Sequence, residues 1–147
     1  MSIDLAARFA AYADDFERAY VDRNWARLGP YFADDAVYEC RSPPALAFRV
    51  VGRAAILERF ADVTDAFDRR FDSRSISFAP ARVDGQRVSI TGVVVYTLAG
   101  APPFRLPFTE LADYRGVAIA HLEDAASPEA LAELADWMGR YGERLQR

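Results

Sequence analysis

The stretch from Phe104 to Asp124 constrains the fold of this chain more than any other part of the sequence. It holds two extended runs, FRLPFTELADY and VAIAHLED, joined at Arg115-Gly116. Apolar residues that alternate with polar ones are typical of strands with one buried face, so the stretch predicts an antiparallel hairpin. The same pattern precedes it, which makes the hairpin part of a larger sheet.

Alternation begins about thirty residues upstream of this hairpin. Residues 74–83 and 86–99 have the pattern of two strands around the hairpin signal Asp84-Gly85, and residues 100–103 turn the chain into the next strand. The four extended segments together predict a long antiparallel meander.

Helical periodicity appears on both sides of the meander. Apolar residues recur at spacings of three and four in residues 3–22, 52–67 and 128–145, which predicts three amphipathic helices. Ser127 is the expected N-cap of the last helix, and Pro128 suits its first position. The faces expected to be buried carry Leu5, Phe9, Tyr12, Phe16 and Tyr20; then Ile56, Phe60, Val63 and Phe67; and finally Leu131, Leu134, Met138, Tyr141 and Leu145.

The segment between the first two long helices predicts shorter elements. Asn24 is the expected N-cap of a short helix through Leu28 that Gly29-Pro30 interrupts, and Asp34-Asp35 is the expected turn after it. Trp25 is expected to pack on the first helix as a lid.

One more strand is predicted before the second long helix. Residues 36–41 (AVYECR) have a strand pattern, and Ser42-Pro43-Pro44 ends it because proline removes a ladder donor, so a loop follows. No repeat or linker divides the chain, so residues 1–147 are predicted to form a single domain. Helices followed by a meander predict an α+β fold in which the early helices pack on one face of a curved antiparallel sheet.

Composition excludes several functions. No apolar run approaches the roughly 18 residues of a membrane span, and a net charge of −4 with scattered arginines argues against nucleic-acid binding. Cys40 is the one cysteine and His121 the one histidine, so neither a disulfide nor a zinc site is expected, and no cofactor is predicted. The first residues show no basic segment followed by an apolar core, so a cytoplasmic location is the default expectation.

Both faces of the strand at residues 88–98 are rich in apolar side chains, whereas a face that meets water alternates more cleanly. One face carries Val88, Ile90, Val94, Tyr96 and Leu98. Val93 and Val95 lie on the other. A homodimer that pairs the outer sheet faces of two copies is the expectation, and burial under the C-terminal helix is the alternative.

The order of elements resembles the nuclear transport factor 2-like superfamily, and within it the bacterial SnoaL-like proteins. The resemblance rests on YVDRNWARLGPYFADDAVYE, where the first helix ends, on VVGRAAILERF, which enters the helix at residues 52–67, and on FTELADYRGVAIAHLED in the last hairpin. It implies a cone-shaped curved sheet closed by the N-terminal helices around a pocket, a cystatin-like α+β barrel. Because relatives include isomerases, cyclases, dehydratases, epoxide hydrolases and inactive binding modules, the resemblance leaves the function open.

Ketosteroid isomerases give the first comparison of individual residues. Their site combines a tyrosine, an aspartate base and a protonated acid. The resemblance places Phe16 at the tyrosine position, Cys40 at the base position and Glu110 at the acid position. Two of the three groups are changed, which argues against steroid isomerisation of that kind.

Polyketide cyclases of the SnoaL type give the second comparison. Their acid/base aspartate lies near the end of the last strand, where the resemblance places Asp124. In this register Ala118, Ala120, Leu122 and Asp124 face the cone. A shift by one residue would instead turn His121 and Glu123 inward.

Glu110 and Asp124 are the strongest catalytic candidates. An acid with Phe108 and Ala112 as neighbours on its face should have a raised pKa, which suits a hydrogen-bond donor or a general acid. Alternatively, Glu110 is a solvated carboxylate at the cone mouth or pairs with an arginine such as Arg49. Alternatively, the carboxylate of Asp124 stabilises the last helix by lying near the positive end of its dipole.

The remaining candidates are ranked lower. His121 is a third catalytic candidate because its ordinary pKa lies near neutrality, although the register above turns it outward. The expected ligand-binding residues are Phe16, Tyr20, Tyr38, Cys40, Phe108 and Leu122, for each of which core packing is the alternative.

These observations predict a protein that binds a small, mostly apolar organic ligand. If it is an enzyme, it should perform metal-free acid/base chemistry of the isomerase, cyclase or dehydratase kind. The alternative is a non-catalytic binding or dimerisation module whose cone is filled by its own aromatic side chains.

Overall fold

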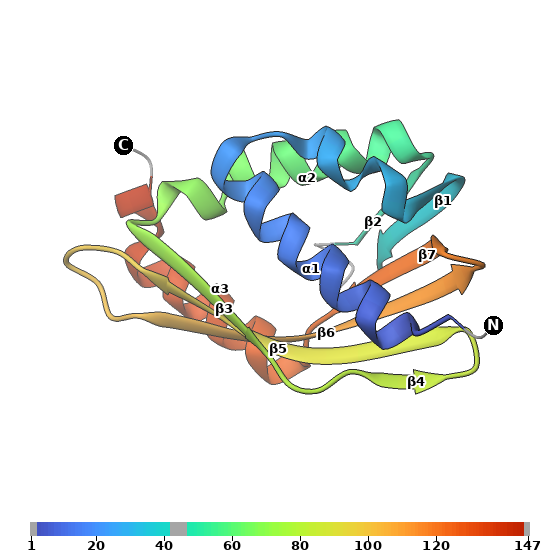
Figure 1. The fold of residues 1–147 in the computed structure, drawn as a ribbon. Coiled ribbons are helices and arrows are strands. Elements are labelled where there is room, and N and C mark those ends of the chain that lie inside the picture. Colours follow the sequence, from blue (N-terminus) through green and yellow to red (C-terminus); the bar gives the residue numbers. More distant parts are fainter. Residues whose placement is uncertain (1–2, 42–46, 146–147) are drawn as a thin grey trace.

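The computed structural model describes residues 3–41 and 47–145, in which helices pack on one face of a curved sheet (Figure 1). The helices are α1 (Leu5–Asp22), α2 (Arg53–Ala66) and α3 (Pro128–Tyr141), with short 3₁₀ segments η1 (Trp25–Tyr31), η3 (Asp68–Arg70) and η4 (Gly142–Leu145). The strands are β1 (Phe32–Cys40), β2 (Phe48–Val51), β3 (Ser73–Phe78), β4 (Arg82–Asp84), β5 (Arg87–Thr97), β6 (Phe104–Arg115) and β7 (Ala118–Ala125). This arrangement confirms the predicted α+β cone. Among the described residues no helix is long and apolar enough to span a membrane.

Side-chain caps mark the starts of two of the three long helices. Asp4 caps α1 by accepting a hydrogen bond from the backbone N–H of Ala7 at 3.0 Å. Ser127 caps α3 in the same way, accepting from the N–H of Ala130 at 3.1 Å, which confirms the predicted helix start.

The strand order is β2-β1-β7-β6-β5-β3, and β4 also pairs with β5. Strands β3, β5, β6 and β7 are antiparallel, as the predicted meander requires. However, β1 pairs with β7 in parallel, so the sheet is mixed. A tight hairpin forces antiparallel pairing only on strands that follow each other in the chain, and β1 and β7 are far apart in sequence.

Three predictions about local structure are wrong. Asp34-Asp35 forms no turn but lies inside β1, where Arg53 pairs with Asp34 at 2.7 Å and Arg115 pairs with Asp35. The region taken as a loop after Pro44 includes β2, which pairs with β1; the predicted stop at Ser42-Pro43-Pro44 lies outside the described residues.

The third wrong prediction is the single strand at residues 74–83. It is two strands, because the segment that holds Pro80 leaves the ladder between β3 and β4.

The short helix after α1 also differs in detail from the expectation. It is a 3₁₀ segment that continues through Gly29-Pro30, and the side chain of Asn24 makes no capping hydrogen bond. Trp25 does act as a lid on the first helix, because its ring lies 5.3 Å from that of Phe16.

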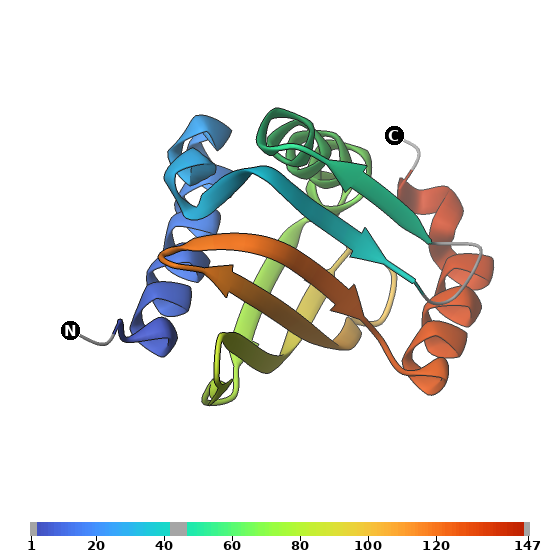
Figure 2. The same ribbon diagram turned by 90° about the vertical axis from the view of Figure 1, so that its right-hand side faces the viewer.

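Figure 2 shows α1 and α3 at opposite ends of the molecule, with strands running between them. The main core lies between α1, α2 and the sheet, and a second cluster surrounds α3. In that second cluster Trp137 packs on Phe71 and Phe104, with ring centroids 5.5 and 6.0 Å away. Met138 was expected to be buried but is 36% exposed, and the neighbouring Trp137 is buried instead. A bulky ring that spans the gap between α3 and the sheet displaces its neighbour to the surface.

Helix α3 packs on the face of β5 that carries Tyr96, because Tyr96, Phe104 and Trp137 belong to one cluster. Val93 and Val95 point to the opposite face and are half-buried. The C-terminal helix therefore does not cover them.

Candidate functional site

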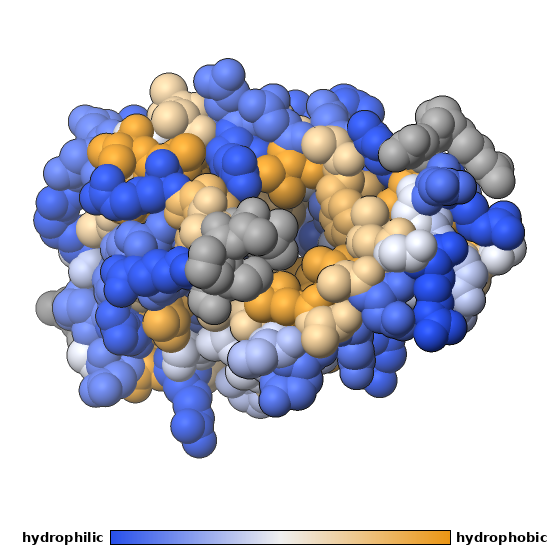
Figure 3. All heavy atoms as spheres, turned by 180° about the vertical axis from the view of Figure 1, so that it is seen from behind, coloured by the Kyte–Doolittle hydropathy of each residue, from blue (hydrophilic) through white to orange (hydrophobic). Residues whose placement is uncertain are grey.

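A cavity of about 310 Å³ lies inside the cone, between the helices and the inner face of the sheet. Five phenylalanine rings dominate its walls: Phe16, Phe60, Phe67, Phe78 and Phe108. It reaches the surface beside Val63 and Phe78, each 38% exposed. Figure 3 shows a hollow on one face of the molecule with apolar side chains around it. Ligand pockets have volumes from about 300 Å³ upward, so the space suits a small organic molecule.

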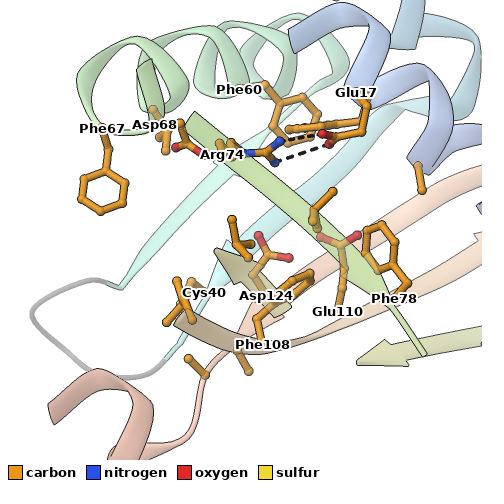
Figure 4. A pocket seen from close by; sticks show the side chains of 18 of the residues that line it. Glu17, Cys40, Phe60, Phe67, Asp68, Arg74, Phe78, Phe108, Glu110 and Asp124 are labelled. Carbon is orange, nitrogen blue, oxygen red and sulfur yellow. Dashed lines mark hydrogen bonds and ion pairs between the residues drawn. The ribbon is translucent and has the colours of Figure 1, made fainter. Parts of the chain in front are cut away.

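Glu110 and Asp124 lie side by side in this cavity (Figure 4). They are Cα partners on β6 and β7, and the next pair along, Ala112 and Leu122, is fully buried on the same face. Because side chains alternate along a strand, this register turns both acids inward. The expected pairing of Glu110 with Arg49 is not observed, because Arg49 contacts Glu39 at 4.0 Å. Glu110 itself is half-buried and lines the cavity.

Burial is the main reason that the pKa of Glu110 is raised well above its usual value, and the charge of Asp124 and a hydrogen bond with it add to the shift. Tyr38 donates its hydroxyl to Oδ2 of Asp124. The other oxygen, Oδ1, is buried and has no hydrogen-bond partner among the described residues. The raised pKa of Glu110 favours its protonated form, and that form can donate a hydrogen bond to Asp124.

Tyr12 on α1 completes this end of the cavity. Burial raises the pKa of its hydroxyl well above 10.0, and the nearby charges of Glu110 and Asp124 raise it further. The hydroxyl therefore stays protonated and can donate a hydrogen bond. Sequence reasoning assigned Tyr12 to the helix face and Phe16, one turn later, to the tyrosine position. The structure places both side chains at the cavity wall.

A second cluster of polar side chains at the cavity wall surrounds Arg74. Its Nη1 contacts Oε1 of Glu17 at 2.6 Å, and its Nε contacts Oδ2 of Asp68 at 2.8 Å. Tyr96 also donates to Oδ2 of Asp68, at 3.0 Å. Burial raises the pKa of Asp68, although the charge of Arg74 opposes the shift. The guanidinium lies 4.6 Å from the ring centroid of Tyr20.

The expected ligand-binding residues divide into two groups. Phe16, Cys40 and Phe108 line the cavity. Tyr38 lies behind Asp124, and its ring contacts Phe48 and Phe60 at 4.8 and 5.2 Å. Like Tyr38, neither Tyr20 nor Leu122 lines the cavity. The ring of Tyr20 packs against the guanidinium of Arg74, and Leu122 is fully buried.

His121 lies on the outer face of the sheet. Its Nε2 is 2.9 Å from Oε2 of Glu39, and its Nδ1 is 3.5 Å from Oδ2 of Asp113. The structure thus separates His121 from the paired acids of the cavity. It also excludes the register that would turn His121 and Glu123 inward.

One detail of the predicted register is wrong. Ala118 and Ala120 were expected to face the cone, but the fully buried residue there is Ile119. The pairing shifts between Asp113 and Tyr114, so Asp113 pairs with His121 while Tyr114 pairs with Ile119. This irregularity adds one residue to β7 and reverses the alternation beyond it.

Four cavity residues escaped sequence reasoning: Tyr12, Glu17, Asp68 and Arg74. Tyr12 was expected only on the buried face of the first helix, and no local pattern marks the other three, which only the folded chain brings together. Among residues 3–41 and 47–145, no three His, Cys, Asp or Glu side chains are grouped to hold a metal ion.

Comparison with known proteins agrees with this architecture. The model of the SnoaL-like domain family matches residues 12–126. No curated protein matches the chain. A protein with a ketosteroid isomerase-like fold from Catenulispora acidiphila, solved in complex with trimethylamine, is 28% identical; the match covers 93% of this chain and 98% of that one, with a TM-score of 0.64.

Two further solved structures share the fold at lower identity. An NTF2-like protein of unknown function from Burkholderia pseudomallei is 14% identical over 93% of this chain and 98% of its own, with a TM-score of 0.66. TerC, co-crystallised with polyporic acid, is 18% identical over 88% of this chain and 98% of its own, with a TM-score of 0.65.

Proposed function

The chain belongs to the SnoaL-like domain family, and we propose that it binds a small, mostly apolar organic molecule in the cavity and performs metal-free acid/base chemistry on it. The observation that carries the proposal is the Glu110–Asp124 pair, two facing carboxyls in an apolar cavity with a tyrosine hydroxyl bound to one of them. Two solved structures of this fold hold small ligands, trimethylamine in one and polyporic acid in the other, which supports a ligand-binding role.

The pair supports a division of roles. The raised pKa of Glu110 favours its protonated form, which can donate a hydrogen bond to a carbonyl oxygen or a proton to a departing hydroxyl. Asp124 is the base that accepts a proton from the carbon next to that carbonyl. Tyr38 holds Asp124 in place through its hydroxyl, and Tyr12 is a second donor at the same end. Isomerisation returns the proton to another carbon, and dehydration releases water.

Exchange of carbon-bound protons tests this role without knowledge of the natural substrate. The protein is incubated in D₂O with cyclic β,γ-unsaturated ketones, and NMR follows deuterium uptake and double-bond migration. The wild type should accelerate exchange, and Asp124→Asn should lose at least about a hundredfold of that acceleration. Glu58→Gln, which changes an exposed acid of α2, is the matched control. Equal exchange by wild type and Asp124→Asn would reject the catalytic role.

The alternative is a binding module without turnover, which the mainly aromatic cavity wall also suits. It would bind ligands in the cavity yet catalyse no exchange.

We also propose that the protein is a homodimer through its outer sheet face. Val93 and Val95 on β5 point outward, and α3 does not cover them. Sedimentation of the wild type should show a dimer, and Val95→Arg should shift it to a monomer. A wild type that stays monomeric at every concentration would contradict this proposal.

A further inference from the structure

We propose that the cavity selects a protonated amine carried on an apolar body. This inference rests on the proposed function, because it names the class of molecule that the same cavity takes.

The charge of the described cavity wall is the first observation. Four of its residues carry carboxyl groups, Glu17, Asp68, Glu110 and Asp124, and Arg74 is the only lysine or arginine among the lining residues that the structure describes. Even with a proton on Glu110, three carboxyl groups accompany one guanidinium. Charges in an enclosed apolar space are screened far less than at the surface, so this excess of acid favours a cation and disfavours an anion.

The state of Arg74 is the second observation. Its guanidinium is almost fully buried and is held by Asp68 at 2.8 Å and by Glu17 at 2.6 Å. Two carboxylates thus compensate its single charge. A ligand carboxylate would have to displace one of them, and it would leave a buried acid without its partner. Arg74 is therefore not an anion-binding group.

The aromatic wall is the third observation. Phe60, Phe67, Phe78 and Phe108 line the same space as the acids (Figure 4). Phe16 also belongs to this lining. Aromatic faces attract cations, and this attraction strengthens when the cation has lost its water. A neutral polar group gains less from these rings. An ammonium group with apolar substituents matches both the acids and the rings.

Isothermal titration with three probes of one shape tests the inference. 4-Phenylbutylamine is a cation at pH 7, 4-phenylbutanol is neutral, and 4-phenylbutanoate is an anion. The cation should bind about tenfold more tightly than the alcohol, and the anion more weakly than both. If the alcohol binds as well as the cation, or the anion binds best, the inference is overturned while a ligand-binding cavity stands. If no probe binds, both proposals fail.

Two variants show whether the acids of the cavity cause the preference. Glu17→Gln removes one acid from the wall, and the ratio of cation to alcohol affinity should fall about threefold or more. Glu58→Gln removes the same charge from the exposed face of α2 and should leave the ratio unchanged. If the ratio of cation to alcohol affinity falls equally in the two variants, the preference comes from the net charge of the protein and the inference is overturned.

Discussion

Gly92 on β5 and Phe108 on β6 are Cα partners, and the ring of Phe108 lies where a side chain of residue 92 would begin. A β-carbon on Gly92 would be 2.7 Å from Cζ of Phe108 and 2.9 Å from the carbonyl oxygen of Ser77. Phe108 in turn contacts the ring of Phe78 edge-on at 5.9 Å, and both rings line the cavity. The cavity wall thus depends on the absence of a side chain at one position of the sheet.

Gly92→Ala should therefore destabilise the protein by about 1–3 kcal/mol, because the Ser77 carbonyl belongs to the backbone and cannot swing aside as a side-chain tip would. Urea unfolding measures the change. The matched control is Gly139→Ala on the exposed face of α3, where a β-carbon meets no atom within 4 Å and should stabilise by up to about 1 kcal/mol. If Gly92→Ala leaves the free energy of unfolding unchanged, the strands β5 and β6 can move apart to admit the β-carbon without a loss of stability.

The stability of the wild type should fall as the pH rises, in part because of Glu110. The pKa of Glu110 is raised in the folded state, so above pH 4.5 the folded chain holds a proton that the unfolded chain has released. The loss approaches about 1.4 kcal/mol per pH unit until the folded pKa is passed.

Glu110→Gln cannot release that proton. In urea unfolding it should become more stable relative to the wild type as the pH rises above 5, until the folded pKa of Glu110 is passed. Glu58→Gln should follow the wild-type profile throughout. Parallel profiles for Glu110→Gln and the wild type would mean that Glu110 is not held protonated.

Much of the fold was predictable because its signals are local. Helix periodicity, the cap at Ser127, the hairpin signal at Asp84-Gly85 and the alternation after residue 74 each depend on neighbouring residues. The structure confirms the long helices and the antiparallel strands that they predict, apart from the break at Pro80. The parallel pairing of β1 with β7 and the irregularity beside Tyr114 escaped prediction. Both depend on how distant segments meet, which no local pattern encodes.

The candidate site was predictable only where a strand carried an acid among apolar neighbours. That signal placed Glu110 and Asp124 on one face, and their pairing across β6 and β7 follows from the hairpin register. Arg74 and Asp68 gave no such signal, because charged residues at the start of a strand or in a connecting segment are ordinarily solvated. Their burial arises from contacts with Glu17 and Tyr96, which belong to other elements.

Tyr38→Phe should cost about 1–3 kcal/mol of stability at pH 7, because it removes the donor to Oδ2 of Asp124 and leaves a buried oxygen unsatisfied. The ring contacts with Phe48 and Phe60 remain, so the loss reports on the hydroxyl alone. Tyr141→Phe, at the half-buried end of α3, is the control and should change stability by less than about 0.5 kcal/mol. Equal effects of the two changes would argue against a hydrogen bond that holds Asp124.

Arg74→Met should destabilise by about 3–5 kcal/mol, because it leaves Asp68 and Glu17 without the charge that compensates them. Arg140→Met is the matched control: it also removes an arginine from an ion pair, but Arg140 and Asp136 are both about two-thirds exposed, so the cost should stay below about 1 kcal/mol.

The pH dependence separates lost charge compensation from lost packing in Arg74→Met. Arg74 lowers the pKa of Asp68 against the effect of burial, so the pKa of Asp68 should rise further in the variant. An acid with a raised folded pKa loses stability as the pH rises, so the deficit should be larger at pH 8 than at pH 5 in urea unfolding. A deficit that is the same at both values would assign the role of Arg74 to its packing on Tyr20 instead.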